Sequence, residues 1–184
     1  RRAGTALIHS AEPVPEIGHR LCTRRQGLIP KVLAPILEKR ARYKVLSKDE
    51  SGIPNPESRA VYKRRAAAHK WILVTCFGYL GFKNARFGKI ESHECVTAWG
   101  RETLLRAKDT VERRGLHLIH ALVDAVWVKL APDTDLEELR RTIETDAGCL
   151  VGLEGVYKWL RFCPSKAGKL SGVPGRYFGC FSDG

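Results

Sequence analysis

Three basic side chains stand at spacings that suit the binding of a phosphate group. Arg40 and Lys44 lie four residues apart in a segment with helical periodicity, so their side chains share one helix face. Like charges at that spacing repel slightly, and a bound anion would remove the penalty. Lys70 lies in the next helical segment and completes a three-cation site if the two helices pack antiparallel. The alternative is a solvated basic helix face, which is the commoner explanation for any single pair.

One carboxylate, that of Asp124, interrupts a strongly apolar stretch. It stands between the runs Ala-Leu-Val and Ala-Val-Trp-Val, and a charge inside an apolar hairpin needs a partner, a metal ion or water. We therefore expect Asp124 to be a metal ligand. The alternative is an ordinary turn residue, because Asp is common in hairpin turns. One Asp does not hold two divalent ions, so a paired-metal site would need a carboxylate from elsewhere.

The overall charge fits a partner that is rich in phosphate. The chain has 32 Lys and Arg against 20 Asp and Glu, a formal net charge of +12, as expected of proteins that bind phosphate polymers. The alternative is a basic protein whose charge has no specific partner. With 184 residues, 43% of them hydrophobic, the chain is able to bury a core of one domain, with or without a protruding element.

The cysteines and the apolar runs exclude several classes of protein. Six cysteines lie far apart without any Cys-x-x-Cys, so neither a zinc ribbon nor a compact disulfide framework is indicated. We interpret His19-x-x-Cys22 as structural. No apolar run is long enough to span a bilayer and no signal segment opens the chain, so we expect a cytoplasmic protein with no membrane partner. The absence of Met suggests a piece of a longer protein.

Periodicity and turn residues predict the elements that position these side chains. Residues 1–27 are rich in Pro, Gly and His and predict an irregular lead-in. Helices over 28–46 and 57–77, joined by a tip loop, predict an antiparallel helical hairpin. Later elements are a helix over 91–114, a β-hairpin over 116–130, a helix opened by the capping box Thr134-Asp-Leu-Glu137 and ending at Gly148, and strands over 151–162 and 176–181. The fold class is therefore α+β, with helices on one face of a mostly antiparallel sheet.

The segment Lys70-Trp-Ile-Leu-Val-Thr-Cys-Phe-Gly78 carries a family motif. It resembles the fingers helix of family B DNA polymerases, which contains Lys-x-x-x-Asn-Ser-x-Tyr-Gly and presents its Lys to the nucleotide phosphates. Val74, Thr75 and Phe77 replace the Asn, Ser and Tyr. The resemblance implies that Lys70 and Phe77 bind the nucleotide. It also implies a turn against the nascent base pair, with Gly78, Tyr79 and Gly81 in contact with DNA.

Two further segments resemble motifs of the same family, in the family's order. The segment from Gly27 to Lys44 is similar to the fingers helix whose Arg and Lys contact the triphosphate, which implies that role for Arg40 and Lys44. His120-Ala-Leu-Val-Asp-Ala125 stands where the family has Tyr-Gly-Asp-Thr-Asp-Ser, a turn that exposes carboxylates to two magnesium ions. Leu122 replaces the first Asp. The second is Asp124, which the resemblance makes the catalytic metal ligand.

The family's DNA-contacting motifs are present in altered form. Thr97-Ala-Trp-Gly-Arg101 matches Thr-x-x-Gly-Arg and implies palm packing and a template contact by Arg101, with a plain surface arginine as the alternative. Gly175-Arg-Tyr-Phe-Gly179 resembles the Lys-Lys-Arg-Tyr-x-Gly strand that holds the primer's minor groove. Pro174 and Gly175 replace the lysines, whereas Arg176 and Tyr177 remain, so the resemblance implies weakened DNA binding.

The resemblance also implies a domain organisation. It assigns a palm lead-in to 1–27, a fingers hairpin to 28–78 and an incomplete palm to 79–184, with the upstream metal-binding strand and the thumb outside this chain. We therefore expect the fragment alone to be inactive and to leave a sheet edge exposed.

The expected function is that of a DNA-templated DNA polymerase that adds dNTPs to a primer 3′-hydroxyl. The expected cofactor is a pair of Mg²⁺ ions, with the second carboxylate outside this segment. Primer-template DNA, dNTPs and the remaining domains of the parent polymerase are the expected partners. The changes at functional positions leave a second hypothesis, an inactivated relative that binds nucleic acid as a structural or regulatory subunit. A third, a generic basic nucleic-acid-binding module, predicts that nucleotide affinity does not depend on Lys70.

Overall fold

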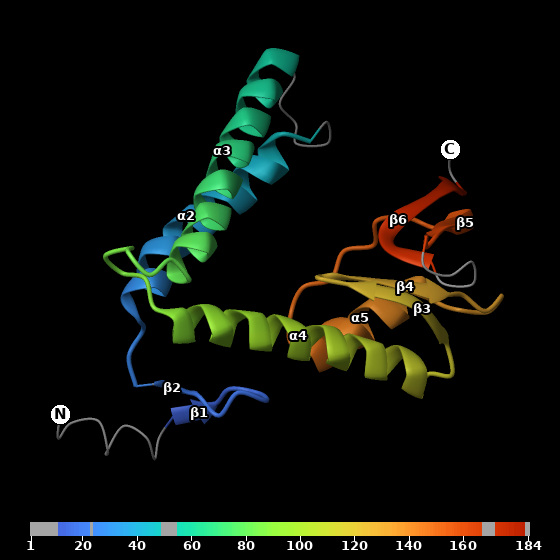
Figure 1. The fold of residues 1–184 in the computed structure, drawn as a ribbon. Coiled ribbons are helices and arrows are strands. Elements are labelled where there is room, and N and C mark those ends of the chain that lie inside the picture. The colour runs from blue at the N-terminus through green and yellow to red at the C-terminus, as the bar shows by residue number, and fades with distance from the viewer. Residues whose placement is uncertain (1–10, 23, 49–54, 167–171, 183–184) are drawn as a thin grey trace. The chain divides into compact units, whose positions relative to one another are not determined.

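The structure is a computed structural model that describes residues 11–22, 24–48, 55–166 and 172–182. It divides into two compact units, Arg1–Ala98 and Trp99–Gly184. Helices and small antiparallel sheets make an α+β fold, which confirms the predicted class (Figure 1). Within the described ranges, no helix is long and apolar enough to cross a membrane.

The first unit contains a small hairpin where the sequence predicted an irregular lead-in. Strand β1 (Ala11–Pro13) pairs antiparallel with β2 (Arg20–Cys22), so that prediction is wrong for these residues. A two-stranded sheet consists only of edge strands, and an edge strand tolerates the missing N–H of Pro13. Positive φ angles at Glu16 and Gly18 turn the chain between the strands.

The predicted helical hairpin is present in the first unit. Helices α2 (Leu28–Leu46) and α3 (Pro56–Leu80) lie side by side and run in opposite directions (Figure 1). Helix α2 continues through Pro35. Helix α3 begins at Pro56, where the Asn55 side chain accepts the backbone N–H of Glu57 at 2.8 Å. Most of the predicted tip loop, residues 49–54, lies outside the described residues.

The division between the units falls within α4 (Ile90–Arg113), and the second unit packs around the later part of this helix. Its β-hairpin consists of β3 (His117–Leu122) and β4 (Ala125–Lys129), as predicted. Helix α5 (Leu136–Ala147) packs beside α4. The core consists of Ala107, Val111, Leu139, Ile143 and Ala147, with Leu116, Leu118, Val126, Val128 and Val151 packed against it.

The start of α5 differs from the prediction by one residue. Asp135 is the N-cap, because its carboxylate accepts the backbone N–H groups of Glu137 and Glu138 at 2.9 and 3.0 Å. Thr134, the expected cap, instead accepts the backbone N–H of Ala131 at 2.9 Å. Thr134 therefore accepts a backbone N–H group of the preceding turn, whereas Asp135 accepts those of the first turn of α5.

The last strands form a separate hairpin. Strand β5 (Tyr157–Pro164) pairs antiparallel with β6 (Gly172–Phe181). The strand predicted from residue 151 begins later, because Gly152 and Gly155 interrupt the apolar alternation. The strand predicted from residue 176 begins earlier, at Gly172. Among the described residues the strands form three two-stranded sheets, where the sequence predicted a single one.

Candidate active site

An aromatic contact brings the three predicted cations to the same level of the α2–α3 hairpin. Tyr43 on α2 packs edge-to-face on His69 of α3, with ring centroids 5.3 Å apart. Arg40 lies one turn before Tyr43 and Lys44 directly after it, whereas Lys70 directly follows His69. Because the helices run in opposite directions, Arg40 and Lys70 lie on the same side of this contact along the hairpin. All three are within about one turn of it.

These cations have no acidic partner among the residues that the structure describes. Arg40, Lys44 and Lys70 form no ion pair with any described residue, although ion pairs occur elsewhere in that part of the chain. The Nε atom of Arg40 is also buried without a hydrogen-bond partner there. A buried donor without a partner costs free energy that an anion would recover. The arrangement is therefore suited to a phosphate group.

Phe77 lies seven residues after Lys70, two turns further along α3 on the same helix face. Its ring stacks on His93 of α4, with centroids 4.3 Å apart and planes at 23°. Nδ1 of His93 lies 3.3 Å from the Phe77 carbonyl oxygen and donates to it in the Nδ1–H tautomer. This carbonyl belongs to the last turn of α3, which lacks helical partners. His93 therefore fixes both the ring and the backbone of Phe77, a role that was not predicted from the sequence.

The turn after α3 starts later than the family motif suggested. Gly78 and Tyr79 are still helical, and Gly81 is the C-cap. A Cβ atom at Gly81 would lie 3.1 Å from Nδ1 of His93, so a larger residue would push against the ring that holds Phe77. The connection to α4 is closed by a hydrogen bond of 2.8 Å from the Lys89 N–H to the Leu80 carbonyl.

Asp124 lies at the tip of the β3–β4 hairpin and is exposed. Water therefore reaches the carboxylate, so its charge is solvated although the flanking residues are apolar. Leu122 and Ala125 close the two-residue turn, and Val123 has a φ angle of 55°. A β-branched residue with positive φ is strained, typically by about 1–3 kcal/mol. The strained turn holds the Asp124 carboxylate out of the sheet.

The Asp124 hairpin packs against the strand that carries the predicted DNA contacts. A Cβ atom at Gly175 would lie 3.5 Å from the Leu122 side chain. An aromatic cluster joins the two hairpins further along. His120 lies 5.1 Å from both Trp127 and Phe162, and Tyr177 lies 5.4 Å from Trp127, measured between ring centroids. This cluster was not predicted from the sequence, although aromatic residues at alternating strand positions could have suggested it.

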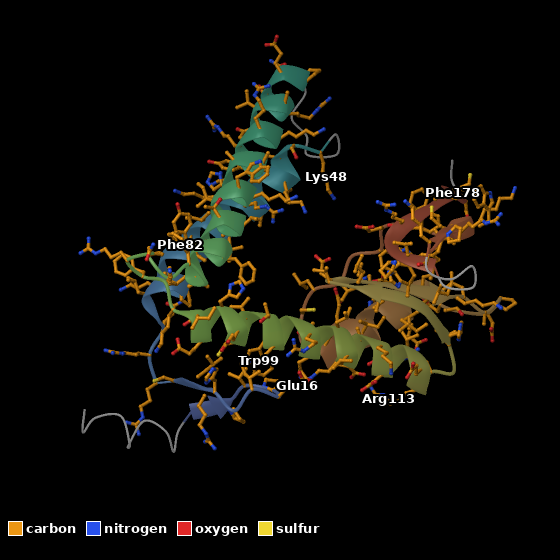
Figure 2. The ribbon with its side chains drawn as sticks, in the orientation of Figure 1. Glu16, Lys48, Phe82, Trp99, Arg113 and Phe178 are labelled. Carbon is orange, nitrogen blue, oxygen red and sulfur yellow. The ribbon has the colours of Figure 1, made fainter. Side chains whose placement is uncertain are left out.

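The scaffold beneath the β3–β4 hairpin is polar as well as apolar. Thr110 is 1% exposed, and its hydroxyl donates a hydrogen bond of 2.7 Å to the Asp146 carboxylate. This hydrogen bond, followed by the charge of Arg113, lowers the pKa of the Asp146 carboxyl. Figure 2 shows Arg113 at the end of α4. Helices α4 and α5 are thus tied together by charge-assisted hydrogen bonds.

The structure separates the predicted site residues into two groups. Arg40, Lys44, Lys70 and Phe77 belong to the first unit, as do Gly78, Tyr79 and Gly81. Asp124 belongs to the second unit with Arg101, Arg176 and Tyr177. Arg101 is exposed on α4, and Tyr177 is half-buried in the aromatic cluster. Among the described residues, no three His, Cys, Asp or Glu side chains gather as metal ligands, so Asp124 offers a single carboxylate.

Comparisons with known proteins agree on one family. Residues 12–139 match the model of DNA polymerase family B. The chain is 32% identical over 144 residues to DNA polymerase 2 of Saccharolobus solfataricus, which covers 78% of this chain and 20% of that protein. It is 29% identical over 170 residues to DNA polymerase 2 of Aeropyrum pernix, and the match covers 92% of this chain and 20% of that protein.

A solved structure shows the same similarity. The family B DNA polymerase from the hyperthermophilic archaeon Pyrobaculum calidifontis superposes with a TM-score of 0.68 at 29% identity, over 95% of this chain and 21% of that one. The chain therefore spans about a fifth of the length of the relatives it matches.

Proposed function

The chain belongs to DNA polymerase family B, and from this premise we propose that it forms the fingers and part of the palm of a DNA-templated DNA polymerase. One observation carries the proposal. Arg40, Lys44 and Lys70 lie at one level of a helical hairpin without counter-ions among the described residues, and Arg40 has a buried donor there that lacks a partner. This is the arrangement that a triphosphate needs.

The residues of the first unit bind and orient the nucleotide. The three cations hold the phosphates of a dNTP, while Phe77, supported by His93, packs against its sugar and base. The Phe77 ring lacks a hydroxyl and excludes a ribose 2′-hydroxyl by its bulk. The end of α3 and the following turn, with Gly78, Tyr79 and Gly81, lie against the nascent base pair.

The residues of the second unit hold the DNA and the reacting end of the primer. Arg101 contacts the template, and Arg176 and Tyr177 contact the primer side of the duplex. The primer 3′-hydroxyl gives up its proton to water and attacks the α-phosphorus of the dNTP in line. A new O–P bond forms, the bond between the α-phosphate and the β-phosphate breaks, and pyrophosphate leaves. Positioning and neutralisation of charge supply most of the catalysis in such transfers.

Asp124 fits the role of a magnesium ligand. Its carboxylate is exposed at a strained turn, and Mg²⁺ is usually bound by one or two carboxylates together with substrate phosphates. When bound, two Mg²⁺ ions would neutralise the charge that develops on the transferred phosphate. The second carboxylate would come from a strand outside this chain.

A second candidate function is favoured by the contact between Leu122 and Gly175. An apolar side chain stands beside the Asp124 turn and packs near a strand that has Pro174 and Gly175 where the family motif has two lysines. This arrangement would suit a relative that has lost catalysis and keeps nucleic-acid binding as a structural or regulatory subunit.

Primer extension by the full-length protein separates the two functions. We expect the wild type to extend a primer with dNTPs and Mg²⁺, and Asp124→Ala to lower the rate by about 10³ because a preorganised charge is lost. DNA affinity should stay within about twofold. Asp133→Ala, which removes another exposed carboxylate of the same unit, is the control and should extend normally. Equal extension by wild type and Asp124→Ala would remove Asp124 from the mechanism. A wild type that binds DNA without extending it would establish the second function.

A further inference from the structure

The β5–β6 hairpin has two different faces. The strand register pairs Phe162 with Tyr177 and Arg161 with Phe178. Phe162 and Tyr177 pack into the aromatic cluster with Trp127, which defines the inner face. Side chains alternate along a strand, so the neighbours of these residues lie on the opposite side. This outer face carries Trp159, Arg161 and Phe178.

The outer face exposes two large aromatic rings. Trp159 is 50% exposed and Phe178 is 53% exposed. Their centroids are 5.8 Å apart and their planes meet at 84°, an edge-to-face pair. In such a pair the partner covers at most one face of either ring. Figure 2 marks Phe178 on β6. Aromatic surface of this size is available for stacking.

The charge of the outer face has a single sign. Strands β5 and β6 contain Lys158, Arg161 and Arg176 and no acidic residue. Arg161 is exposed and forms no ion pair with any described residue. An apolar protein partner would leave its guanidinium group without a counter-charge. A polyanion supplies that charge along its length.

We propose that this outer face binds single-stranded nucleic acid, with unpaired bases stacked on Trp159 and Phe178 and a phosphate held by Arg161. Aromatic platforms flanked by cations are the usual means of binding single strands, since every base offers a face for stacking. The bases of a duplex are already stacked on one another and are not available to these rings. The site is independent of the Asp124 turn and of polymerase activity.

The test uses the full-length protein and a labelled oligothymidylate. Trp159→Ala should weaken single-strand affinity about tenfold, as expected for one lost stacking contact. Arg161→Ala should weaken it less and reduce the salt dependence of binding by about 0.7 of a log unit per log unit of salt, the value for one phosphate. Arg141→Ala is the matched control, because it removes the same charge from another exposed position of the same unit. It should change neither quantity.

Photocrosslinking localises the contact even if other surfaces bind the strand. An oligonucleotide that contains 5-iododeoxyuridine should crosslink to Trp159 or Phe178, and excess duplex should compete poorly. Phe178→Leu, which keeps apolar bulk and removes the aromatic face, serves if Trp159→Ala fails to fold. The proposal is overturned if the wild type does not bind the single strand, or if crosslinks map elsewhere. It is also overturned if Arg161→Ala and Arg141→Ala behave alike.

Discussion

The α2–α3 hairpin and α5 are both rich in charge, but they use it in opposite ways. Helices α2 and α3 contain ten Lys and Arg against two Glu, a net charge of +8. Helix α5 contains four acidic and two basic residues in half the length of α3. In α5 the charges pair with one another and with α4, whereas the three cations of the hairpin pair with no described residue.

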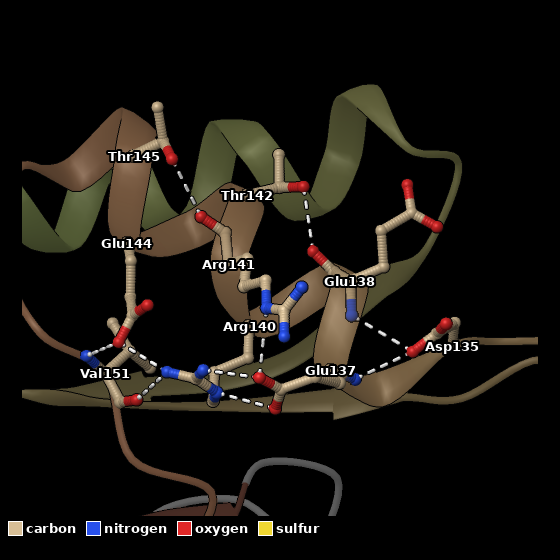
Figure 3. Close-up of polar contacts among 9 residues, drawn as sticks. All are labelled: Asp135, Glu137, Glu138, Arg140, Arg141, Thr142, Glu144, Thr145 and Val151. Carbon is tan, nitrogen blue, oxygen red and sulfur yellow. Dashed lines mark hydrogen bonds and ion pairs between the residues drawn. The ribbon is translucent and has the colours of Figure 1, made fainter.

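The α5 network shows what paired charges do. Arg140 contacts Glu137 at 2.6 Å and Glu144 at 2.5 Å, and it also donates to the Val151 carbonyl at 3.1 Å (Figure 3). The hydrogen bond from Arg140 lowers the pKa of Glu137 to about 2. These contacts organise the helix and the chain that follows it. Paired charge therefore serves the fold, while like charges left unpaired weaken it and become favourable when an anionic partner binds.

The largest expected effect comes from removing one cation of the hairpin. Lys70→Ala in the full-length protein should lower kcat/KM for dNTP by about 10²–10³, because a charge that stabilises the transferred phosphates is lost. Thermal stability should not fall. Arg141→Ala removes an equal charge from α5 and should leave kcat/KM unchanged. A similar loss in both variants would mean that only the overall charge matters. No change in Lys70→Ala would contradict the proposed nucleotide site and favour the generic basic module.

The second prediction concerns the packed core between α4 and α5, which we expect to stabilise the second unit. Ile143 is 5% exposed in the core between α4 and α5, so Ile143→Ala should cost about 3 kcal/mol of stability. Leu37→Ala in α2 shortens an aliphatic side chain that is 51% exposed and should cost much less. Hydrogen exchange of the α4 and α5 backbone amides measures the difference. Equal protection in the two variants would show that this core does not stabilise the unit.

Sequence patterns predicted the helices and the β3–β4 hairpin because local periodicity and turn residues determine them. The α2–α3 pair and the turn at Val123 and Asp124 follow from such signals. The β1–β2 hairpin was missed, because Pro13 and Pro15 argue against a strand unless the strand is a short edge. The late start of β5 was missed because apolar residues alone do not show where pairing begins.

Residue types and motifs predicted only part of the candidate site. The cations and Asp124 were identified from their spacing and from the family resemblance. The support that His93 gives Phe77 depends on a contact across 16 residues, which no periodic pattern reports. The proximity of Leu122 to Gly175 is a contact of the same kind, because residues distant in sequence meet only through tertiary packing.

The smallest expected effect is the acid sensitivity of α5. A carboxyl whose pKa is lowered on folding contributes stability above its unfolded pKa and loses it as the pH falls. For Glu137 that window runs from the ordinary value of 4.5 down to about 2. Glu137→Gln should therefore lower Tm slightly at pH 7 and match the wild type near pH 2. Salt at 1 M should shrink the difference because the pair is exposed.

Glu38→Gln in α2 is the control. It removes a carboxylate that pairs with no described residue and should not alter the dependence of Tm on pH. A wild-type advantage that persists unchanged at pH 2 would mean that the side chain stabilises α5 without its charge.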